Sequence, residues 1–309
     1  MADVLIGTAV PILLLMGIGF LSRKIGVLKQ GDERVLSSYV YYFALPALFL
    51  IDLAQTRFGF ETLEFIVAGI VPILVVVAFF SLLYVVFRFS KNTFYLVTLS
   101  TIFGNVAFFG IPFVTFAFPA TQTEQLATLA AATIGIVSII IAITLLELYH
   151  LGDAPKREGL KQVARGLTKN PLIISIVVGI LISVAGLEIP SPLSTFLDMV
   201  GGTTSAVAVF MLGAFLYGKE YSNLKLAFGL SLLRIMFLPT LALATLTLFN
   251  LPSTSNSLLV LMNAMPVAVS LSVFSQRYNF YKETVASLTL ISSVGAIIYL
   301  NIWLTILGI

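Results

Sequence analysis

Ten apolar stretches follow one another along this 309-residue chain, and they limit its fold more than any other feature. Each approaches the roughly 20 residues that cross a bilayer as a helix. Backbone groups inside a membrane must bond within their own segment, so we expect helices rather than open strands. The sequence predicts an all-α membrane protein with ten transmembrane helices, at approximately 4–21, 35–53, 65–87, 93–118, 125–148, 171–187, 197–217, 224–249, 257–276 and 284–307.

Composition supports this class and argues against others. Hydrophobic residues make up 59% of the chain and charged residues 10%, and the mean hydropathy is +1.07. The chain has no cysteine and one histidine, His150, which excludes disulfides and thiolate chemistry. Asp and Glu are missing from the middle of the apolar stretches, so we expect that the protein is not an enzyme and has no metal site. Basic residues lie in short links rather than on one face, which argues against a nucleic-acid partner.

Positive charge alternates between the links. Fifteen of the 17 Lys and Arg residues lie in or beside odd-numbered links, whereas Arg57 lies in an even-numbered link and Arg234 within the eighth stretch. Cytoplasmic links carry an excess of Lys and Arg. We therefore expect a multi-pass protein of the cell (inner) membrane, surrounded by lipid, with both termini extracytoplasmic.

The longest link, residues 149–170, divides the chain into two halves with five stretches each. With an odd number of spans, the second half must enter the membrane from the opposite side. The sequence therefore predicts two inverted five-helix repeats, 1–148 and 171–309, joined by a cytoplasmic link at 149–170.

An Asn and a Pro interrupt the fourth and the ninth stretch near the middle, at Asn105 and Pro112 and at Asn263 and Pro266. Proline breaks or kinks a helix. Irregular backbone at that depth is tolerated only beside protein or a water-filled cavity. Either break alone is explained equally well by helix packing, but matched breaks in two halves are typical of a transporter's binding site.

The expected breaks would start new half-helices near Pro112 and Pro266. Such helix starts carry free N–H groups and partial positive charge, which attract an anion such as a carboxylate. Asn105 and Asn263 would add amide groups there, and Gly110 would let backbone approach a ligand. These five residues form the predicted anion-binding site, and broken helices 4 and 9 would cross beside it.

Arg234 lies ten residues into the eighth stretch, which is about 15 Å along a helix and near the membrane midplane. Placing an arginine there costs roughly 2.5–3.5 kcal/mol on insertion scales. Two interpretations remain open: the side chain snorkels or bonds helix-end carbonyls, or it contacts an anionic substrate as a sixth site residue. We expect Asp52, Asp198 and Glu147 near the membrane faces.

At these interruptions the sequence resembles the auxin efflux carrier family, which includes plant PIN-FORMED exporters and bacterial malonate and malate permeases. Asn105 followed by Gly110-Ile111-Pro112 resembles the fourth-helix motif of that family. Ala264-Met265-Pro266 resembles the ninth-helix region, and Leu45-Pro46-Ala47 the second-helix motif. The ten-helix layout extends the resemblance over nearly the whole chain.

The resemblance implies a fold related to the bile acid sodium symporters. Helices 3–5 and 8–10 would form a transport domain that moves like an elevator, and helices 1, 2, 6 and 7 a scaffold at a homodimer interface. Plant members carry a long hydrophilic loop between helices 5 and 6, whereas the corresponding link here is only 149–170.

We therefore expect a secondary transporter of a small organic anion, such as an auxin-like monocarboxylate or a dicarboxylate like malate or malonate, without a cofactor. The alternative is a sodium-coupled symporter of the bile acid type. Hydroxyl oxygens that sodium could use are available near the breaks, at Ser100, Thr101, Thr115, Ser270 and Ser272.

Overall fold

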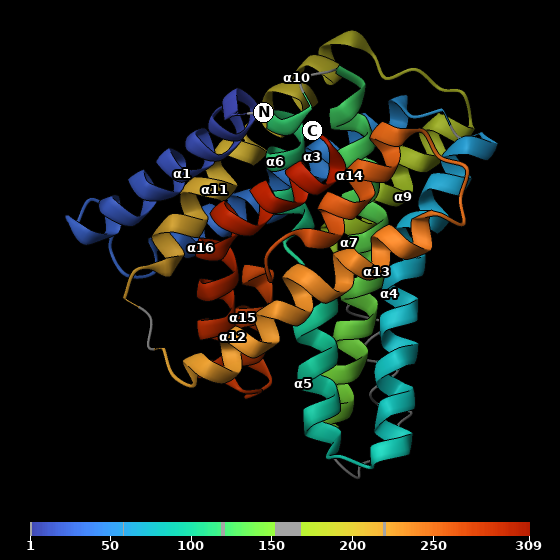
Figure 1. Ribbon diagram of the computed structural model, residues 1–309. Coiled ribbons are helices and arrows are strands. Elements are labelled where there is room, and N and C mark those ends of the chain that lie inside the picture. The colour runs from blue at the N-terminus through green and yellow to red at the C-terminus, as the bar shows by residue number, and fades with distance from the viewer. Residues whose placement is uncertain (1, 58, 119–120, 152–167, 219–220) are drawn as a thin grey trace.

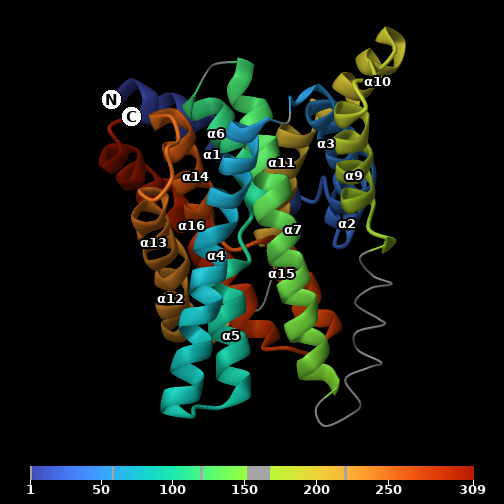
Figure 2. The ribbon, with the colours of Figure 1, turned by 90° about the vertical axis from the view of Figure 1, so that its right-hand side faces the viewer.

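The computed structural model describes residues 2–57, 59–118, 121–151, 168–218 and 221–309. Most of the predicted link 149–170 lies outside these residues. The regular secondary structure of the described residues is helical, and one isolated β-bridge is present. Figures 1 and 2 both place the two termini at the same end of the molecule.

Each of the ten predicted stretches corresponds to one helix or to an interrupted helix. The first half contains α1 (Ala2–Lys24), α2 (Asp32–Tyr39), η1 (Val40–Ala44), α3 (Leu45–Gln55), α4 (Phe60–Phe87), α5 (Lys91–Ile102), η2 (Val106–Gly110), α6 (Ile111–Ala117) and α7 (Thr121–Leu151). The second half contains α9 (Pro171–Val184), α10 (Ser191–Gly201), α11 (Thr204–Leu216), α12 (Leu224–Leu232), η3 (Leu233–Phe237), α13 (Leu238–Leu246), α14 (Ser253–Ala264), α15 (Val269–Arg277) and α16 (Lys282–Leu307).

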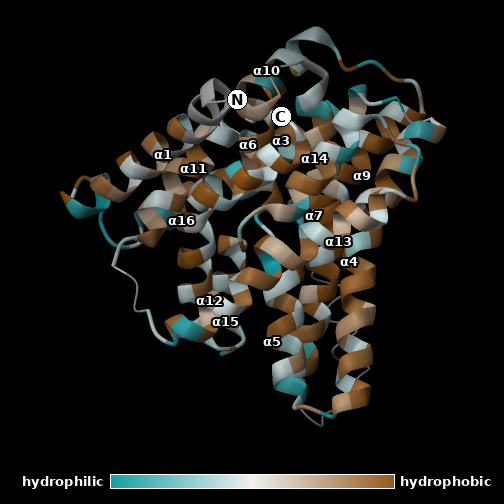
Figure 3. Cartoon of the chain, in the orientation of Figure 1, coloured by the Kyte–Doolittle hydropathy of each residue, from teal (hydrophilic) through white to brown (hydrophobic). Residues whose placement is uncertain are grey.

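Five helical stretches in the described residues are long and apolar enough to cross a membrane, or six if the bent α16 counts as one span. One of them is α4, which displays apolar residues along nearly its whole length (Figure 3). Large side chains on this helix, such as Leu82, Val85 and Phe87, are exposed. Such a surface suits contact with lipid. The chain is therefore a multi-pass membrane protein, although its spans by this criterion are fewer than the ten that we predicted.

Three short π-helical turns, η1, η2 and η3, each end two residues before a proline: Pro46, Pro112 and Pro239. A proline cannot donate to the carbonyl four residues earlier and its ring clashes with it. A widened turn just before the proline relieves that clash without ending the helix. At Pro239 the carbonyl concerned belongs to Ile235, and the buried Trp303 indole donates to it at 2.8 Å.

Glycines bring two helix pairs into close contact. A Cβ on Gly19 of α1 would lie 1.9 Å from the carbonyl oxygen of Phe210 on α11. A Cβ on Gly213 of α11 would lie 1.9 Å from the carbonyl oxygen of Met16 on α1. Gly179 similarly lets α9 approach the backbone of α3. Helices packed in lipid rely on such small residues, because van der Waals contact rather than water exclusion drives their association.

Candidate functional site

The two interrupted helices meet at their breaks. Gly104 and Val267 form an antiparallel β-bridge. The Asn105 N–H donates to the Pro266 carbonyl at 2.7 Å, and the Ala268 N–H donates to the Phe103 carbonyl at 3.0 Å. Each break thus satisfies backbone groups of the other, as irregular backbone away from water requires. The crossing of helices 4 and 9 that the resemblance implied is present.

The breaks themselves differ from the sequence prediction. In the fourth stretch the non-helical residues are 103–105, and helical backbone resumes at Val106 rather than near Pro112. Pro112 lies in the first turn of α6, where the preceding π-turn accommodates it. In the ninth stretch residues 265–268 are non-helical, so Pro266 lies inside the break and α15 starts at Val269. Proline therefore marks the neighbourhood of each break but not its position.

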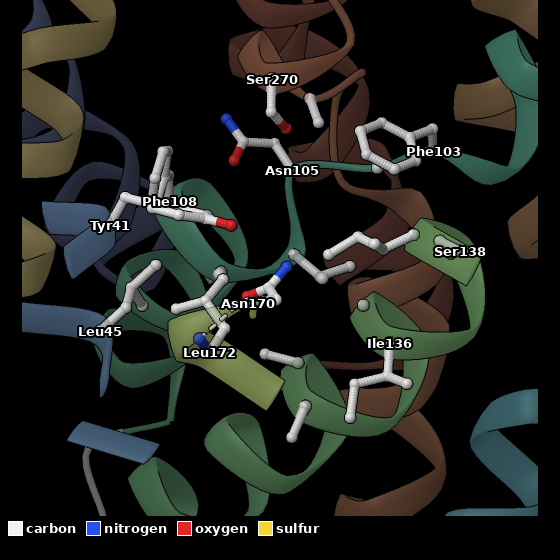
Figure 4. Close-up of a pocket in the computed structure, with 18 of the residues that line it drawn as sticks. Tyr41, Leu45, Phe103, Asn105, Phe108, Ile136, Ser138, Asn170, Leu172 and Ser270 are labelled. Atoms are coloured by element: carbon white, nitrogen blue, oxygen red, sulfur yellow. Dashed lines mark hydrogen bonds between the residues drawn. The ribbon is translucent and has the colours of Figure 1, made fainter. Parts of the chain in front are cut away.

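A cavity of about 100 Å³ lies beside the crossing (Figure 4). Its walls come from the fourth-stretch break with η2, from η1 and α3, and from α7, α9 and α15. The lining is mainly apolar and aromatic, with Phe103, Phe108 and Phe274 among its residues, and no charged residue belongs to the lining within the part of the chain that the structure describes. Among the described residues, five lining side chains are polar: Tyr41, Asn105, Ser138, Asn170 and Ser270.

Asn105 is a buried polar residue of this lining with free bonding capacity. This residue is only 4% exposed, and its side-chain Nδ2 has no acceptor among the described residues. The Asn105 carbonyl accepts from the N–H groups of Phe109 and Gly110. The first three N–H groups of the new half-helix, at Val106, Ala107 and Phe108, donate to no acceptor in the described chain. These unpaired donors and the positive end of the helix dipole favour an anionic group beside Asn105.

Two other polar side chains of the lining stabilise backbone. Asn170 caps α9, because its Oδ1 accepts from the Leu172 N–H at 2.9 Å. Ser138 Oγ donates to the Ile102 carbonyl at the end of α5, at 3.1 Å. Tyr41 and Ser270 bring hydroxyl groups to the cavity. The sequence alone did not assign Asn170, Ser138 or Tyr41 to the site. The Asn-Pro pair at 170–171 signals a helix start, but nothing local places it beside Asn105.

Four predicted site residues pack within the crossing without bordering the cavity. Gly110 faces the side chains of Met262 and Met265, and Pro112 is buried in α6. Asn263 is fully buried, and its Nδ2 donates to the Leu259 carbonyl of its own helix at 2.9 Å. Pro266 contributes the carbonyl that Asn105 bonds.

Arg234, the sixth predicted site residue, is completely buried at the crossing and does not border the cavity. Its Nε donates to the Met265 carbonyl at 2.7 Å. Its Nη1 donates to the Thr101 carbonyl at 2.9 Å and to the Ile102 carbonyl at 3.3 Å, and Nη2 to the Met262 carbonyl at 3.5 Å. The guanidinium therefore bonds helix-end carbonyls, one of the two interpretations left open by the sequence.

The carboxylates that we expected near the membrane faces are in part buried between helices. Asp52 accepts from the Thr128 hydroxyl on α7 at 2.6 Å. Glu147 accepts from the Tyr278 hydroxyl at 2.6 Å. Neither borders the cavity. Their burial depends on packing between distant helices, which hydropathy along the sequence does not report.

Apolar helices in a multi-pass arrangement, with two broken helices crossing beside a small cavity, define the class of membrane transport proteins. A family model described as membrane transport protein matches residues 4–304. The chain belongs to this family, that of the auxin efflux carriers, whose members are transporters rather than enzymes.

Individual relatives agree with this assignment. The chain is 20% identical to the uncharacterized transporter YfdV of Escherichia coli (strain K12), over 97% of this chain and 96% of the relative. It is 24% identical to the uncharacterized transporter MJ1031 of Methanocaldococcus jannaschii, over 94% of this chain and 95% of the relative. It is also 25% identical to the mouse lysosomal cholesterol signaling protein, over 93% of this chain but only 36% of that protein.

Proposed function

We propose that this transporter is a secondary carrier of a small organic anion and that the anion binds in the cavity beside Asn105. The observation that carries the proposal is the set of unpaired donors: the Asn105 amide and the N–H groups of Val106, Ala107 and Phe108. A carboxylate would accept hydrogen bonds from several of them at once. Candidate substrates are an auxin-like monocarboxylate and a dicarboxylate such as malate or malonate.

Helix pairing supports the proposed architecture of ten spans in two inverted repeats. In two such repeats, α1 would correspond to α9, and the span formed by α2 and α3 would correspond to the span formed by α10 and α11. The counterpart of the helix pair α1–α11 is then the pair α9–α3. Both pairs pack closely. The fourth and ninth spans would exchange with each other, and they contact each other directly. Termini at the same end of the molecule suit an even number of spans (Figure 2).

The position of the cavity supports an elevator-like movement. Tyr41, Leu45 and Ile176 line it from the proposed scaffold, whereas Asn105 and Ser270 line it from the proposed transport domain. A substrate held there would touch both domains and would travel with Asn105 when the transport domain slides along the scaffold. We further propose that two copies of the chain form a homodimer through their scaffolds and that both termini are extracytoplasmic.

Uptake by reconstituted vesicles tests the proposal. We expect saturable uptake of at least one anion from a panel of radiolabelled monocarboxylates and dicarboxylates, above that of protein-free vesicles. Gly135→Phe would place a ring in the cavity that Gly135 lines and should abolish uptake. Gly229→Phe is the matched control, because nothing lies within 4 Å of a Cβ at that exposed position. Equal uptake by wild type and Gly135→Phe would contradict the placement of the site.

A further inference from the structure

The C-terminal ends of two half-helices converge on one side chain. α5 ends at Ile102 and α14 at Ala264, and the carbonyls near both ends accept hydrogen bonds from Arg234. Helix C-termini carry unpaired carbonyls and a partial negative charge. Two such ends close together repel each other unless a cation lies between them, and away from water that repulsion is weakly screened.

The backbone around the guanidinium is shaped to hold it. A Cβ on Gly104 would lie 1.7 Å from Nη2 of Arg234, so only a glycine leaves room for the guanidinium at this point. Arg234 itself lies on η3, the π-turn that precedes Pro239. Arg234 thus lies on the widened turn that accommodates Pro239, and the glycine at position 104 leaves the space that the guanidinium fills.

An inorganic cation does not fit the same position. A sodium-coupled mechanism would place the ion among carbonyl oxygens exposed by the broken helices. Here the Met265 and Thr101 carbonyls lie 2.7 Å and 2.9 Å from guanidinium nitrogens. The oxygens and the space that a sodium ion would need at this point are therefore occupied by a side chain with a permanent charge.

We infer that Arg234 is the built-in cation of the crossing: it holds the two half-helix ends together and frees this carrier from a sodium or potassium ion at that position. Met265, which Arg234 bonds, directly precedes Pro266, whose carbonyl fixes the Asn105 backbone. Arg234 is thus a positioning residue for the anion site. The inference rests on the proposed carrier function for its transport consequence, but not for its effect on stability.

The first experiment compares wild-type protein in sodium, potassium and choline chloride at equal ionic strength. Without substrate, the melting temperature in detergent should be the same in all three salts. In vesicles, uptake of the transported anion should also be the same. A drop in uptake of tenfold or more when choline replaces sodium would overturn the inference.

The second experiment uses variants of Arg234 and Gly104, which together form what we call the clamp. Arg234→Ala should lower the melting temperature, and millimolar methylguanidinium or sodium should restore part of it, whereas choline should not. Arg234→Lys should keep cation independence, because the charge remains, although it bonds fewer carbonyls. Gly104→Ala should lower the melting temperature by displacing the guanidinium, whereas Gly229→Ala, with open space around its Cβ, should not.

The outcomes separate the two proposals. Wild-type melting temperatures for both Arg234→Ala and Gly104→Ala would overturn the clamp. Loss of stability in Arg234→Ala without any response to methylguanidinium or sodium would also overturn the cation role. If Arg234→Ala does not fold, Gly104→Ala and the wild-type salt series decide. If no anion is transported but the stability results hold, the carrier proposal fails and the clamp stands.

Discussion

The two Asn residues of the crossing occupy similar places in the sequence but different environments in the structure. Asn105 lies inside its break, after the end of α5, with an unpaired amide at the cavity. Asn263 lies one residue before the end of α14, so its amide still reaches the Leu259 carbonyl of its own helix. A shift of four residues relative to the helix end, from one residue before it to three residues after it, separates the Asn263 amide, which bonds its own helix, from the Asn105 amide of the cavity lining.

This difference indicates that two broken helices that cross need not contribute equally to a site. Both breaks exchange backbone hydrogen bonds across the β-bridge. In the fourth-stretch break, free N–H groups follow Asn105 directly, because η2 begins there. In the ninth-stretch break, the N–H groups of Val269 and Ser270 also have no acceptor in the described chain, but Asn263 lies outside that break and does not border the cavity. The following predictions test how far the inequality of the two breaks extends, beginning with the largest expected effect.

Asn105→Asp should abolish binding of the transported anion. A carboxylate at this position would occupy the unpaired N–H groups and repel an anion, and no charged residue of the described lining would offset that repulsion. Asn263→Asp replaces the amide that bonds Leu259 by a buried acid, so its main effect should be a lower melting temperature. Calorimetric titration measures anion binding by both variants, and thermal scanning measures their melting temperatures. Equal loss of binding in the two would mean that the site extends to Asn263.

Replacement by alanine should separate the two positions more quantitatively. Losing a partner in a site shielded from water costs about 1–3 kcal/mol, so Asn105→Ala should weaken anion binding on the order of 5- to 150-fold. Asn263→Ala removes a buried oxygen that has no partner in the described structure and introduces a better helix former. We expect it to bind anion like wild type and to melt at the same or a higher temperature. Weakened binding by Asn263→Ala would contradict this asymmetry.

Much of this arrangement could be predicted from the sequence. Each stretch that hydropathy located is helical or an interrupted helix in the described residues, since the length of an apolar run is a local property. The positions of Asn105 and Pro266 marked the two breaks, and these lie against each other. The family followed from the motifs at the same residues.

What the sequence could not supply depends on tertiary contact. A proline predicts a disturbed helix but does not say whether a π-turn absorbs it, as η2 does before Pro112. Arg234 had two open interpretations, because its acceptors at Thr101 and Met265 come from helices distant in the sequence. Asn170 reaches the cavity only because α9 packs on α3.

The two prolines provide the next test. Pro112→Ala restores an N–H that can bond the Phe108 carbonyl, so η2 should relax toward a regular α-helix and turn its first N–H groups away from the cavity. We expect anion affinity to fall several-fold with little loss of stability. Pro266→Ala should have a smaller effect, because the Asn105 N–H bonds the backbone carbonyl of this residue rather than its ring. Affinities from radioligand binding compare the two, and a larger loss for Pro266→Ala would reverse this order.

The smallest effect is expected at Gly110, which lies where η2 contacts α14. A Cβ there would come within 2.9 Å of Met262 Sδ and 3.1 Å of Met265 Cγ. Both atoms belong to flexible methionine side chains, which can adopt other rotamers. Gly110→Ala should therefore cost only about 1 kcal/mol of stability and leave anion affinity unchanged, because the cavity lies elsewhere. Thermal unfolding and binding measured on the same preparation check both parts. A loss of binding as large as that of Asn105→Ala would mean that the glycine itself contacts the anion, as its position in the sequence had suggested.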